Sequence, residues 1–255
     1  MNYLSKKELT QLRKIPDLVV PDDSIFELPE KVLQFGTGVL LRGLPDYLID
    51  KANRQGIFNG RIVVVKSTDS GDSSAFDTQD GLYTLCMRGV ELGQNIEENI
   101  ICSAISRVLS AKYHWQSVLD CAKNPELQII ISNTTEVGIQ LVQDNISDMP
   151  PTSFPGKLLA FLYARFTAFG GTKESGLVIV PTELIIDNGS KLESIVIELA
   201  HRNGLESDFL DWLESANYFC NSLVDRIVPG KPDTVVYQNI TQELGYKDKL
   251  LTMSE

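Results

Sequence analysis

Short apolar runs that alternate with segments of helical periodicity are the feature that most restricts the fold of this chain. The runs KVLQF (31–35), RIVVVK (61–66) and LQIIIS (127–132) each end in a polar or glycine-containing loop. Such runs are typical of parallel strands, which are buried on both faces by helices. Between the first two runs, residues 40–53 have apolar side chains at helical spacing, and Pro45 is expected in the first turn or at a kink. A strand, a helix and a strand within about 35 residues have the size of a right-handed βαβ unit.

The rest of the sequence continues this alternation. We expect a strand at 81–88 that pairs with the run near 99–108, and a further strand at 177–180. Helices are expected at 113–122, 157–169, 191–201 and 209–216, with a connecting segment at 221–228. The pattern predicts an α/β fold that is Rossmann-like and doubly wound, with a mostly parallel sheet and flanking helices.

The composition is that of an ordinary globular protein and argues against several kinds of partner. The 255 residues are 43% hydrophobic and 22% charged, which allows a large core. The formal net charge of -11 is not offset by any cluster of Lys and Arg, so neither nucleic acid nor an anionic membrane is expected as a partner. The cysteines and histidines lack the spacing of a metal site, and no apolar stretch is long enough for a membrane span or a signal sequence. We expect a cytoplasmic protein with reduced thiols and no metal.

A glycine-containing turn follows the first expected strand, at Gly36, Thr37 and Gly38. Glycines at this point let the backbone approach a pyrophosphate, whose charge is attracted by the amide groups at the start of the next helix. Leu41 stands in place of the usual third glycine, and Arg42 follows either as a fixed positive charge or as a packing residue. A short glycine pattern is also compatible with a plain turn.

Asp69 follows the second expected strand and is a candidate for recognising the cofactor. At this position a carboxylate can accept hydrogen bonds from both ribose hydroxyls of adenosine and repels a 2′-phosphate, which favours NAD over NADP. An aspartate shortly before Gly71 is equally suited to a plain turn, because its side chain can bond to nearby backbone amides.

Asn133, Thr134 and Glu136 follow the strand expected at 127–132. They lie at the carboxyl edge of the predicted sheet, where ligands of open α/β folds bind. Two interpretations stay open for these polar groups, since they can hold the nicotinamide ribose or cap the next helix.

Five motifs in a fixed order give the sequence a strong resemblance to a known family. FGTGVLLRG, TQDGLYT, SNTTEVGI, VPTELI with the DNG that follows, and NSLVDRIVPG resemble the mannitol dehydrogenase family of long-chain polyol and uronate oxidoreductases. The resemblance covers nearly the whole chain from Val32 onward. It implies a Rossmann-like domain that binds NAD and an enzyme that acts on a small sugar acid. Within the family, the sequence is most similar to members of hexuronate catabolism that reduce D-tagaturonate to D-altronate with NADH.

The resemblance also implies roles for individual residues. Position by position, the family's cofactor contacts fall on Gly36, Thr37, Gly38, Arg42, Asp69, Asn133, Thr134 and Glu136. Asp225 and Arg226 match the VDR segment that faces the active-site cleft, although an ion pair at the start of a helix explains these two residues equally well.

Two departures from the family pattern concern catalysis. Polyol-oxidising members have Cys-Asp-Asn where this sequence has Thr-Glu-Leu, so Leu184 replaces the amide that polarises the reacting oxygen, and Asn188 is the nearest amide. The catalytic lysine of the family's Lys-x4-Asn-x2-His pattern is absent, although reduction of a carbonyl needs such an acid. Asp225 and Asn188 are therefore the candidate catalytic residues, and this chain alone should bind the cofactor but turn over poorly.

The expected domain organisation has three parts. Residues 1–28 are a leader, residues 29–235 the dinucleotide-binding domain, and residues 236–255 the start of a linker. Because the end KDKLLTMSE has no cap or turn signal, we expect the linker to lead to a C-terminal helical catalytic domain as the partner of this one. Two alternatives stay open: a fructuronate or polyol dehydrogenase of the same family, and a non-catalytic module that binds NAD(H).

Overall fold

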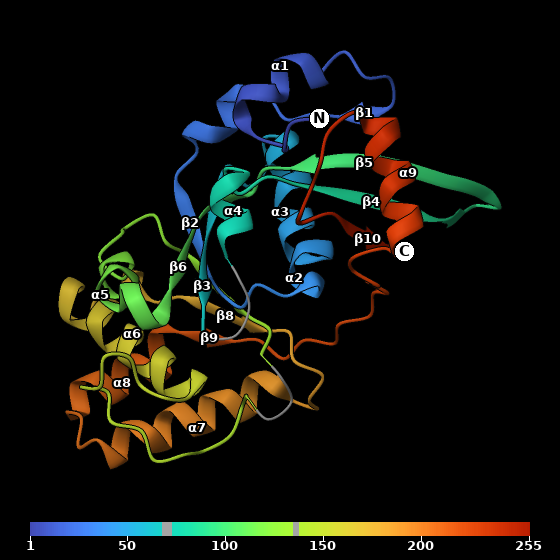
Figure 1. Cartoon of the computed structure of the whole chain (residues 1–255). Coiled ribbons are helices and arrows are strands. Elements are labelled where there is room, and N and C mark those ends of the chain that lie inside the picture. Colours follow the sequence, from blue (N-terminus) through green and yellow to red (C-terminus); the bar gives the residue numbers. More distant parts are fainter. Residues whose placement is uncertain (68–72, 135–137) are drawn as a thin grey trace.

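Two β-sheets form the frame of the computed structural model (Figure 1), which describes residues 1–67, 73–134 and 138–255 and only the backbone of Glu91. The larger sheet has six strands, all parallel, in the order β6-β3-β2-β7-β8-β9. Counted along the chain, this order is 3-2-1-4-5-6, the order of doubly wound dinucleotide-binding domains. The predicted fold class is confirmed. The strands are β2 (Glu30–Phe35), β3 (Arg61–Lys66), β6 (Ile105–Ser110), β7 (Ile129–Ser132), β8 (Val178–Pro181) and β9 (Tyr218–Phe219).

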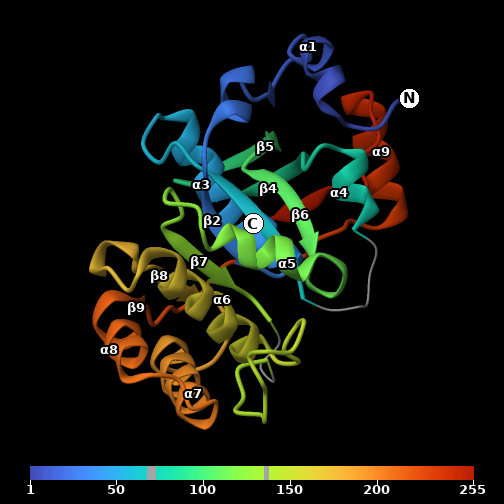
Figure 2. The same ribbon diagram turned by 90° about the vertical axis from the view of Figure 1, so that its left-hand side faces the viewer.

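Alternate side chains of the large sheet enter two different hydrophobic clusters. Leu33 and Phe35 of β2 belong to the cluster formed with α5 (Ala111–Cys121), α6 (Phe154–Phe169), α7 (Asn188–Arg202) and α8 (Ser207–Ala216). Val32 and the β3 residues Ile62 and Val64 belong to the cluster with α2 (Val39–Gly43), α3 (Pro45–Arg54), α4 (Ser74–Thr78) and the smaller sheet. Figure 2 shows α5 and α6 lying against the large sheet. Burial on both faces explains why these strands are continuous apolar runs.

The predicted helix at 40–53 is divided into two helices. The backbone leaves the helical region at Leu44, with φ -127° and ψ -83°, and α3 begins at Pro45. Proline has no amide hydrogen to donate and its ring clashes with the carbonyl one turn earlier, so it starts a helix more easily than it continues one. Pro45 is thus in the first turn of a helix, as one of the two expectations had it, and a break at Leu44 separates this helix from α2.

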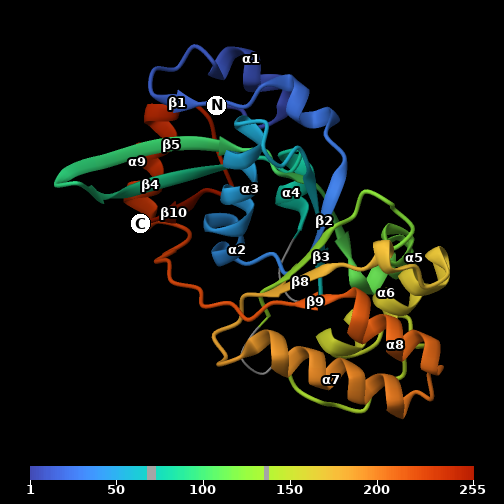
Figure 3. The ribbon, with the colours of Figure 1, turned by 180° about the vertical axis from the view of Figure 1, so that it is seen from behind.

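The smaller sheet contains a hairpin that projects from the molecule (Figures 1 and 3). The strands of the smaller sheet lie in the order β1 (Leu18–Val19), β5 (Gln94–Cys102), β4 (Tyr83–Glu91) and β10 (Thr252–Ser254). β4 and β5 are antiparallel, and the two residues between them, Leu92 and Gly93, have the positive φ angles of a tight hairpin turn. The prediction that 81–88 pairs with 99–108 was only half right. β5 ends at Cys102, and after it the Ala104 carbonyl accepts from the Ile62 amide at 2.8 Å, which carries the chain into the large sheet.

Both ends of the described chain lie on this smaller sheet. Leu4 and Leu9, near the amino end, share a hydrophobic cluster with Ile240 and Leu244 of α9 (Thr234–Leu244). β1 and β10 pair in parallel with β5 and β4, respectively. The expected leader (1–28), the expected dinucleotide-binding domain (29–235) and the expected linker (236–255) therefore all contribute residues to this one hydrophobic cluster. The remaining short elements are η1 (Lys6–Glu8), α1 (Leu9–Leu12), η2 (Asp23–Glu27) and η3 (Lys173–Ser175).

Candidate functional site

The carboxyl ends of β2 and β7 mark the point where the strand order of the large sheet reverses. The two strands are neighbours, with Phe35 opposite Ser132. The chain continues from β2 to α2 on one face of the sheet and from β7 to α6 on the other. Connections that diverge in this way leave a crevice in which the ligands of open α/β sheets bind. A cleft of about 490 Å³ lies here, lined by Gly36, Thr37, Gly38, Ser67, Asn133, Thr134, Gly138, Thr152, Ser153, Phe154 and Lys157.

Gly36 crosses the strand ends so closely that no other residue fits. Its φ is +128°, and a Cβ atom would lie 2.8 Å from the Asn133 carbonyl oxygen and 2.9 Å from Cδ1 of Leu41. The Gly36 amide donates to the Val65 carbonyl at 3.0 Å. Leu41, at the position of the missing third glycine, is buried and fills the space beside the turn. Backbone conformation and close neighbours therefore restrict this position to glycine.

Gly38 differs from Gly36, because nothing in the protein requires a glycine there. It is the N-cap of α2 with φ -66° and ψ 160°, which any residue can adopt. A Cβ atom would meet nothing within 4 Å. The missing side chain leaves the backbone of the cleft wall accessible to a ligand.

Arg42 supports the turn from behind and is not among the residues that line the cleft. Its guanidinium is buried, donates to the Thr37 carbonyl at 2.8 Å and to Oγ1 of Thr252 at 3.1 Å, and lies over the rings of Phe76 and Tyr83. Burial lowers the pKa of Arg42 from its ordinary value. The structure shows Arg42 packed behind the turn as a buried charge, and its direct contact with a cofactor stays a prediction.

Asn133 and Thr134 are held in place by the residues that follow β8. The Asn133 side chain donates to the carbonyl and the hydroxyl of Thr182 at 2.9 and 3.1 Å. The buried carboxylate of Glu183 accepts from the amide and hydroxyl of Thr134 at 2.8 and 3.0 Å, and from the Ser132 hydroxyl at 3.2 Å. The helix-capping alternative is wrong for both residues, because the next helix in the described part of the chain is α6, which has a different cap.

The opposite wall of the cleft comes from the start of α6, which the sequence analysis did not include in the site. Ser153 caps α6 by accepting from the Gly156 amide at 3.0 Å. Lys157 is buried and donates to the Thr152 carbonyl at 2.7 Å, while the buried Asp144 accepts from the Ser153 hydroxyl and, at 2.8 Å, from the Thr152 amide. The sequence signal was present, since a serine two residues before a proline is typical of a helix start. The predicted helix began three residues too late.

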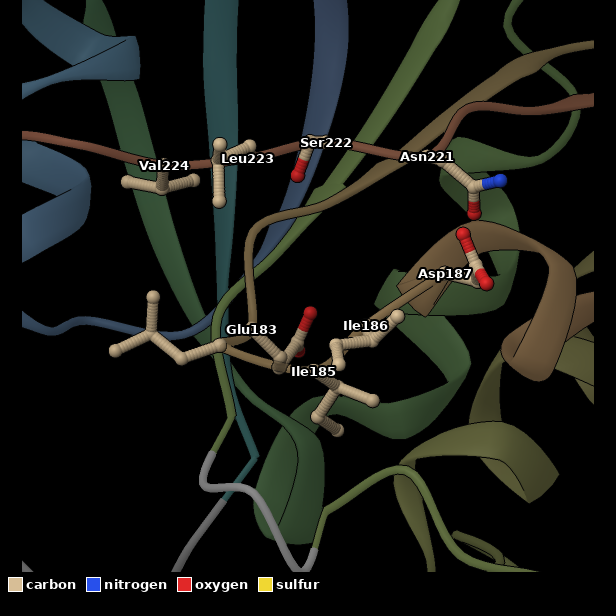
Figure 4. Close-up of a pocket in the computed structure, with 9 residues that line it drawn as sticks. Glu183, Ile185, Ile186, Asp187, Asn221, Ser222, Leu223 and Val224 are labelled. Atoms are coloured by element: carbon tan, nitrogen blue, oxygen red, sulfur yellow. The ribbon is translucent and has the colours of Figure 1, made fainter.

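A second cleft of about 470 Å³ lies between the loop after β8 and the segment after β9 (Figure 4). Glu183 lines it, so this one carboxylate contacts both the second cleft and the Thr134 wall of the first. The rim is apolar and exposed, with Ile186 at 90% and Leu223 at 92% exposure, and Leu184 also exposed.

Asn188 is a structural residue in this arrangement. Its side chain is fully buried and its amide nitrogen donates to the carbonyls of Pro181 and Glu183 at 3.1 and 3.0 Å. Its oxygen accepts from the amides of Gly189 and Ser222 at 2.8 and 2.9 Å. These bonds join the start of α7 to the segment after β9 and occupy the groups that a catalytic amide would offer. The expectation that Asn188 polarises a substrate oxygen is not supported by this geometry.

Asp225 and Arg226 lie in an extended segment, not at the start of a helix. Residues 220–229 have no regular secondary structure, and Asp225 is exposed. Arg226 donates to Oγ of Ser254 at 2.7 Å and lies over the Tyr47 ring. The ion-pair interpretation of this dipeptide is therefore wrong, and the catalytic role of Asp225 stays a prediction. The expected cofactor contacts Asp69 and Glu136 lie outside the described residues.

The described residues contain no group of three or more His, Cys, Asp or Glu side chains placed to hold a metal ion. Among the helices they form, none has both the length and the apolar character needed to span a membrane.

Comparisons with known proteins find similarity along most of this chain. Residues 30–255 match the family model described as mannitol dehydrogenase Rossmann domain. Altronate oxidoreductase of Bacillus subtilis is 44% identical over 234 residues, which are 91% of this chain and 48% of that protein. The protein of the same name from Cronobacter sakazakii is 40% identical over 89% of this chain and 47% of its own length. The chain thus spans about half the length of these relatives.

Solved structures show the same fold. Mannitol 2-dehydrogenase of Pseudomonas fluorescens, in a ternary complex with NAD and D-mannitol, matches with a TM-score of 0.83 at 22% identity, over 99% of this chain and 52% of that chain. D-sorbitol dehydrogenase in substrate-free form matches with a TM-score of 0.80 at 19% identity, over 99% of this chain and 53% of that chain.

Proposed function

This chain belongs to the mannitol dehydrogenase family, and we propose that it forms the NAD-binding half of an oxidoreductase that reduces D-tagaturonate to D-altronate. The observation that carries the proposal is the cleft at the carboxyl ends of β2 and β7, where the Gly36 turn passes so close to the end of β7 that a Cβ atom on Gly36 would lie 2.8 Å from the Asn133 carbonyl oxygen. A backbone this close to the strands leaves room for a dinucleotide across the switch point of the sheet.

The residues of the cleft fit a dinucleotide in distinct ways. The backbone from Gly36 to Gly38 would hold the pyrophosphate, since Gly38 presents no side chain to it. Asn133 and Thr134, fixed by the residues after β8, would hold the nicotinamide ribose. Asp69 would accept the adenosine ribose hydroxyls and favour NAD over NADP. When bound, NADH supplies the hydride that reduces the substrate carbonyl.

The substrate follows from the relatives. Curated proteins that are 38–44% identical to this chain are named altronate oxidoreductase. The segment Thr182-Glu183-Leu184 departs from the Cys-Asp-Asn of polyol-oxidising members, and Leu184, which lines the second cleft, stands at the sequence position of their Asn. An assay of the longer protein with tagaturonate, fructuronate and mannitol tests this assignment, and a preference for either of the last two would overturn it.

The second cleft is the surface that we propose for contact with the rest of the enzyme. Leu184, Ile186 and Leu223 expose apolar surface on its rim, and exposed apolar patches mark contact surfaces. The relatives contain about as many residues again as they share with this chain. We place the acid that protonates the developing alkoxide in that part, so this chain alone should bind the cofactor without efficient turnover.

Calorimetric titration of this chain with NADH and NADPH tests the cofactor assignment. We expect NADH to bind more tightly than NADPH, because a carboxylate beside the ribose repels the 2′-phosphate. Asp69→Ala should weaken NADH binding by about tenfold to about hundredfold, the cost of losing hydrogen bonds to a charged group, and should reduce the preference over NADPH. A folded sample that binds neither nucleotide would refute the assignment.

Glu183→Gln tests whether the buried carboxylate positions the nicotinamide side of the cleft. The variant removes the negative charge and replaces one acceptor oxygen by a donor, so the Thr134 amide and hydroxyl lose a charged partner and the Ser132 hydroxyl must change from donor to acceptor. We expect the dissociation constant for NADH to rise by about tenfold, the effect of one lost hydrogen bond to a charged group. Glu174→Gln, at an exposed position on η3, is the matched control. Equal affinities of the two variants would show that Glu183 has no part in binding.

A further inference from the structure

A buried carboxyl group and a buried amide group lie directly beneath the cofactor turn, which consists of residues 36–38. Asp46 of α3 is 0% exposed, and Gln34 of β2 is buried beside it. The Nε2 group of Gln34 is 3.4 Å from Oδ2 of Asp46 and also 3.4 Å from the carbonyl oxygen of Gly36. One amide group is thus shared between a carboxyl group and the turn that crosses the strand ends.

The two remaining oxygens of this pair indicate how it is protonated. Oδ1 of Asp46 and Oε1 of Gln34 are both buried and have no hydrogen-bond partner. Both atoms are acceptors when Asp46 is ionised, and buried acceptors without a donor are costly. A proton on Asp46 turns one of its oxygens into a donor, which reduces the number of buried acceptors that lack a hydrogen bond.

Ionisation of Asp46 changes the competition for the shared amide. A carboxylate accepts a stronger hydrogen bond than a neutral carboxyl or a backbone carbonyl does. The Nε2 group of Gln34 has one hydrogen for each acceptor, and a stronger pull from Asp46 shifts it away from the Gly36 carbonyl and weakens the second bond. The close backbone contacts hold the Gly36 position, but weakening this bond leaves its carbonyl less firmly oriented, and this carbonyl belongs to the surface to which the pyrophosphate binds.

We propose that Asp46 acts as a protonated positioning residue which, through Gln34, holds the cofactor turn in its binding geometry, so that ionisation of Asp46 weakens dinucleotide binding. The inference rests on the proposed function for its ligand, and on the contacts among Asp46, Gln34 and Gly36 for its mechanism.

The charged and titratable groups around Asp46 place its change of protonation state near neutrality. Burial raises the pKa of Asp46 to about 7, opposed by the hydrogen bond from Gln34 and the positive charge of Arg42 on α2. Tyr83 on β4 and Cys102 on β5 also interact with the Asp46 charge, and burial raises the pKa of both well above their ordinary values, so they stay neutral. The Arg42 guanidinium donates its hydrogen bonds to the Thr37 carbonyl and the Thr252 hydroxyl, and it acts on Asp46 only through its charge.

The experiment compares this chain with Asp46→Asn in two measurements between about pH 6 and about pH 8. The first is the NMR shift of the Thr37 amide, which shares its peptide bond with the Gly36 carbonyl and needs no cofactor. We expect the shift to titrate with a midpoint of about 7 in the unaltered chain and to stay constant in Asp46→Asn. The second is the dissociation constant for NADH, which should rise by about tenfold over this range in the unaltered chain and not in the variant. Asp211→Asn, at an exposed position on α8, should follow the unaltered chain in both.

Gln34→Leu keeps the test decisive if Asp46→Asn does not fold. It retains the carboxyl but removes the link to Gly36, so the Thr37 shift and the NADH affinity should lose their dependence on pH. A wild-type pH dependence in Gln34→Leu would overturn the proposal, as would a Thr37 shift that does not titrate in the unaltered chain. If Thr37 titrates as expected but NADH does not bind at any pH, the cofactor assignment fails and the coupling of Asp46 to the turn stands.

Discussion

Replacing Gly36 by alanine should abolish NADH binding and lower the free energy of unfolding by about 3 kcal/mol. The φ of +128° is unfavourable for alanine, and the added Cβ atom would clash with the Asn133 carbonyl oxygen and the Leu41 side chain. The turn must therefore move away from the ends of β3 and β7, which displaces the backbone that we assign to the pyrophosphate. Calorimetric titration and urea unfolding measure the two effects.

Gly245→Ala is the matched control for the backbone cost alone. Gly245 also has a positive φ, of +74°, but a Cβ atom there would meet nothing within 4 Å. It ends α9, far along the chain from the cleft. We expect this variant to lose about 1 kcal/mol and to bind NADH normally. If Gly36→Ala behaved in the same way, the Gly36 turn would not be part of the cofactor site.

Asp46→Asn should stabilise the protein at alkaline pH and leave it little changed in acid. The folded state raises the pKa of Asp46 from 3.8 to about 7 through burial. A raised carboxyl pKa favours folding fully below the unfolded pKa, and this contribution is lost as the pH rises from the unfolded to the folded value. The free energy of unfolding of the variant, relative to the unaltered chain, should therefore increase by about 4 kcal/mol between about pH 4 and about pH 7 and stay constant above.

The variant also suits the site chemically, because an asparagine amide can donate to the orphaned Oε1 of Gln34 while its oxygen still accepts from Nε2. Urea unfolding at several pH values measures the difference, with Asp211→Asn as the exposed control that should show no such increase. A difference between Asp46→Asn and the unaltered chain that does not change with pH would mean that Asp46 is not buried as a neutral acid.

The parallel strands and the turn could be predicted because their signals are local. Runs such as RIVVVK are apolar throughout because β3 is buried on both faces, and this alone separates them from amphipathic strands. Gly36 follows its strand directly, so its role in a tight crossing could be read from the sequence. The extent of the strand that pairs with β4 was predicted less well, because it depends on where the chain passes from the smaller sheet to the larger one. The start of α6 was also predicted three residues too late.

The roles of individual polar residues could not be predicted in the same way. Arginine and asparagine often bind ligands, but Arg42 and Asn188 are both buried here and donate hydrogen bonds to backbone carbonyls. Lys157 lines the first cleft and Glu183 the second, although no motif singled them out as site residues. Asp46 could not be recognised from the sequence, because its chemistry depends on complete burial beside Gln34.

The sequence by itself determined the parallel α/β class of the large sheet, the position of the cofactor turn and the family to which the chain belongs. These depend on residue patterns within short segments, where burial on both faces and the freedom of glycine leave a clear mark. Only the tertiary structure decided which polar groups face the cleft and which support it from behind. The partner of a buried polar group can come from anywhere in the chain, as Thr252 does for Arg42 from 210 residues away, and no local pattern encodes such a contact.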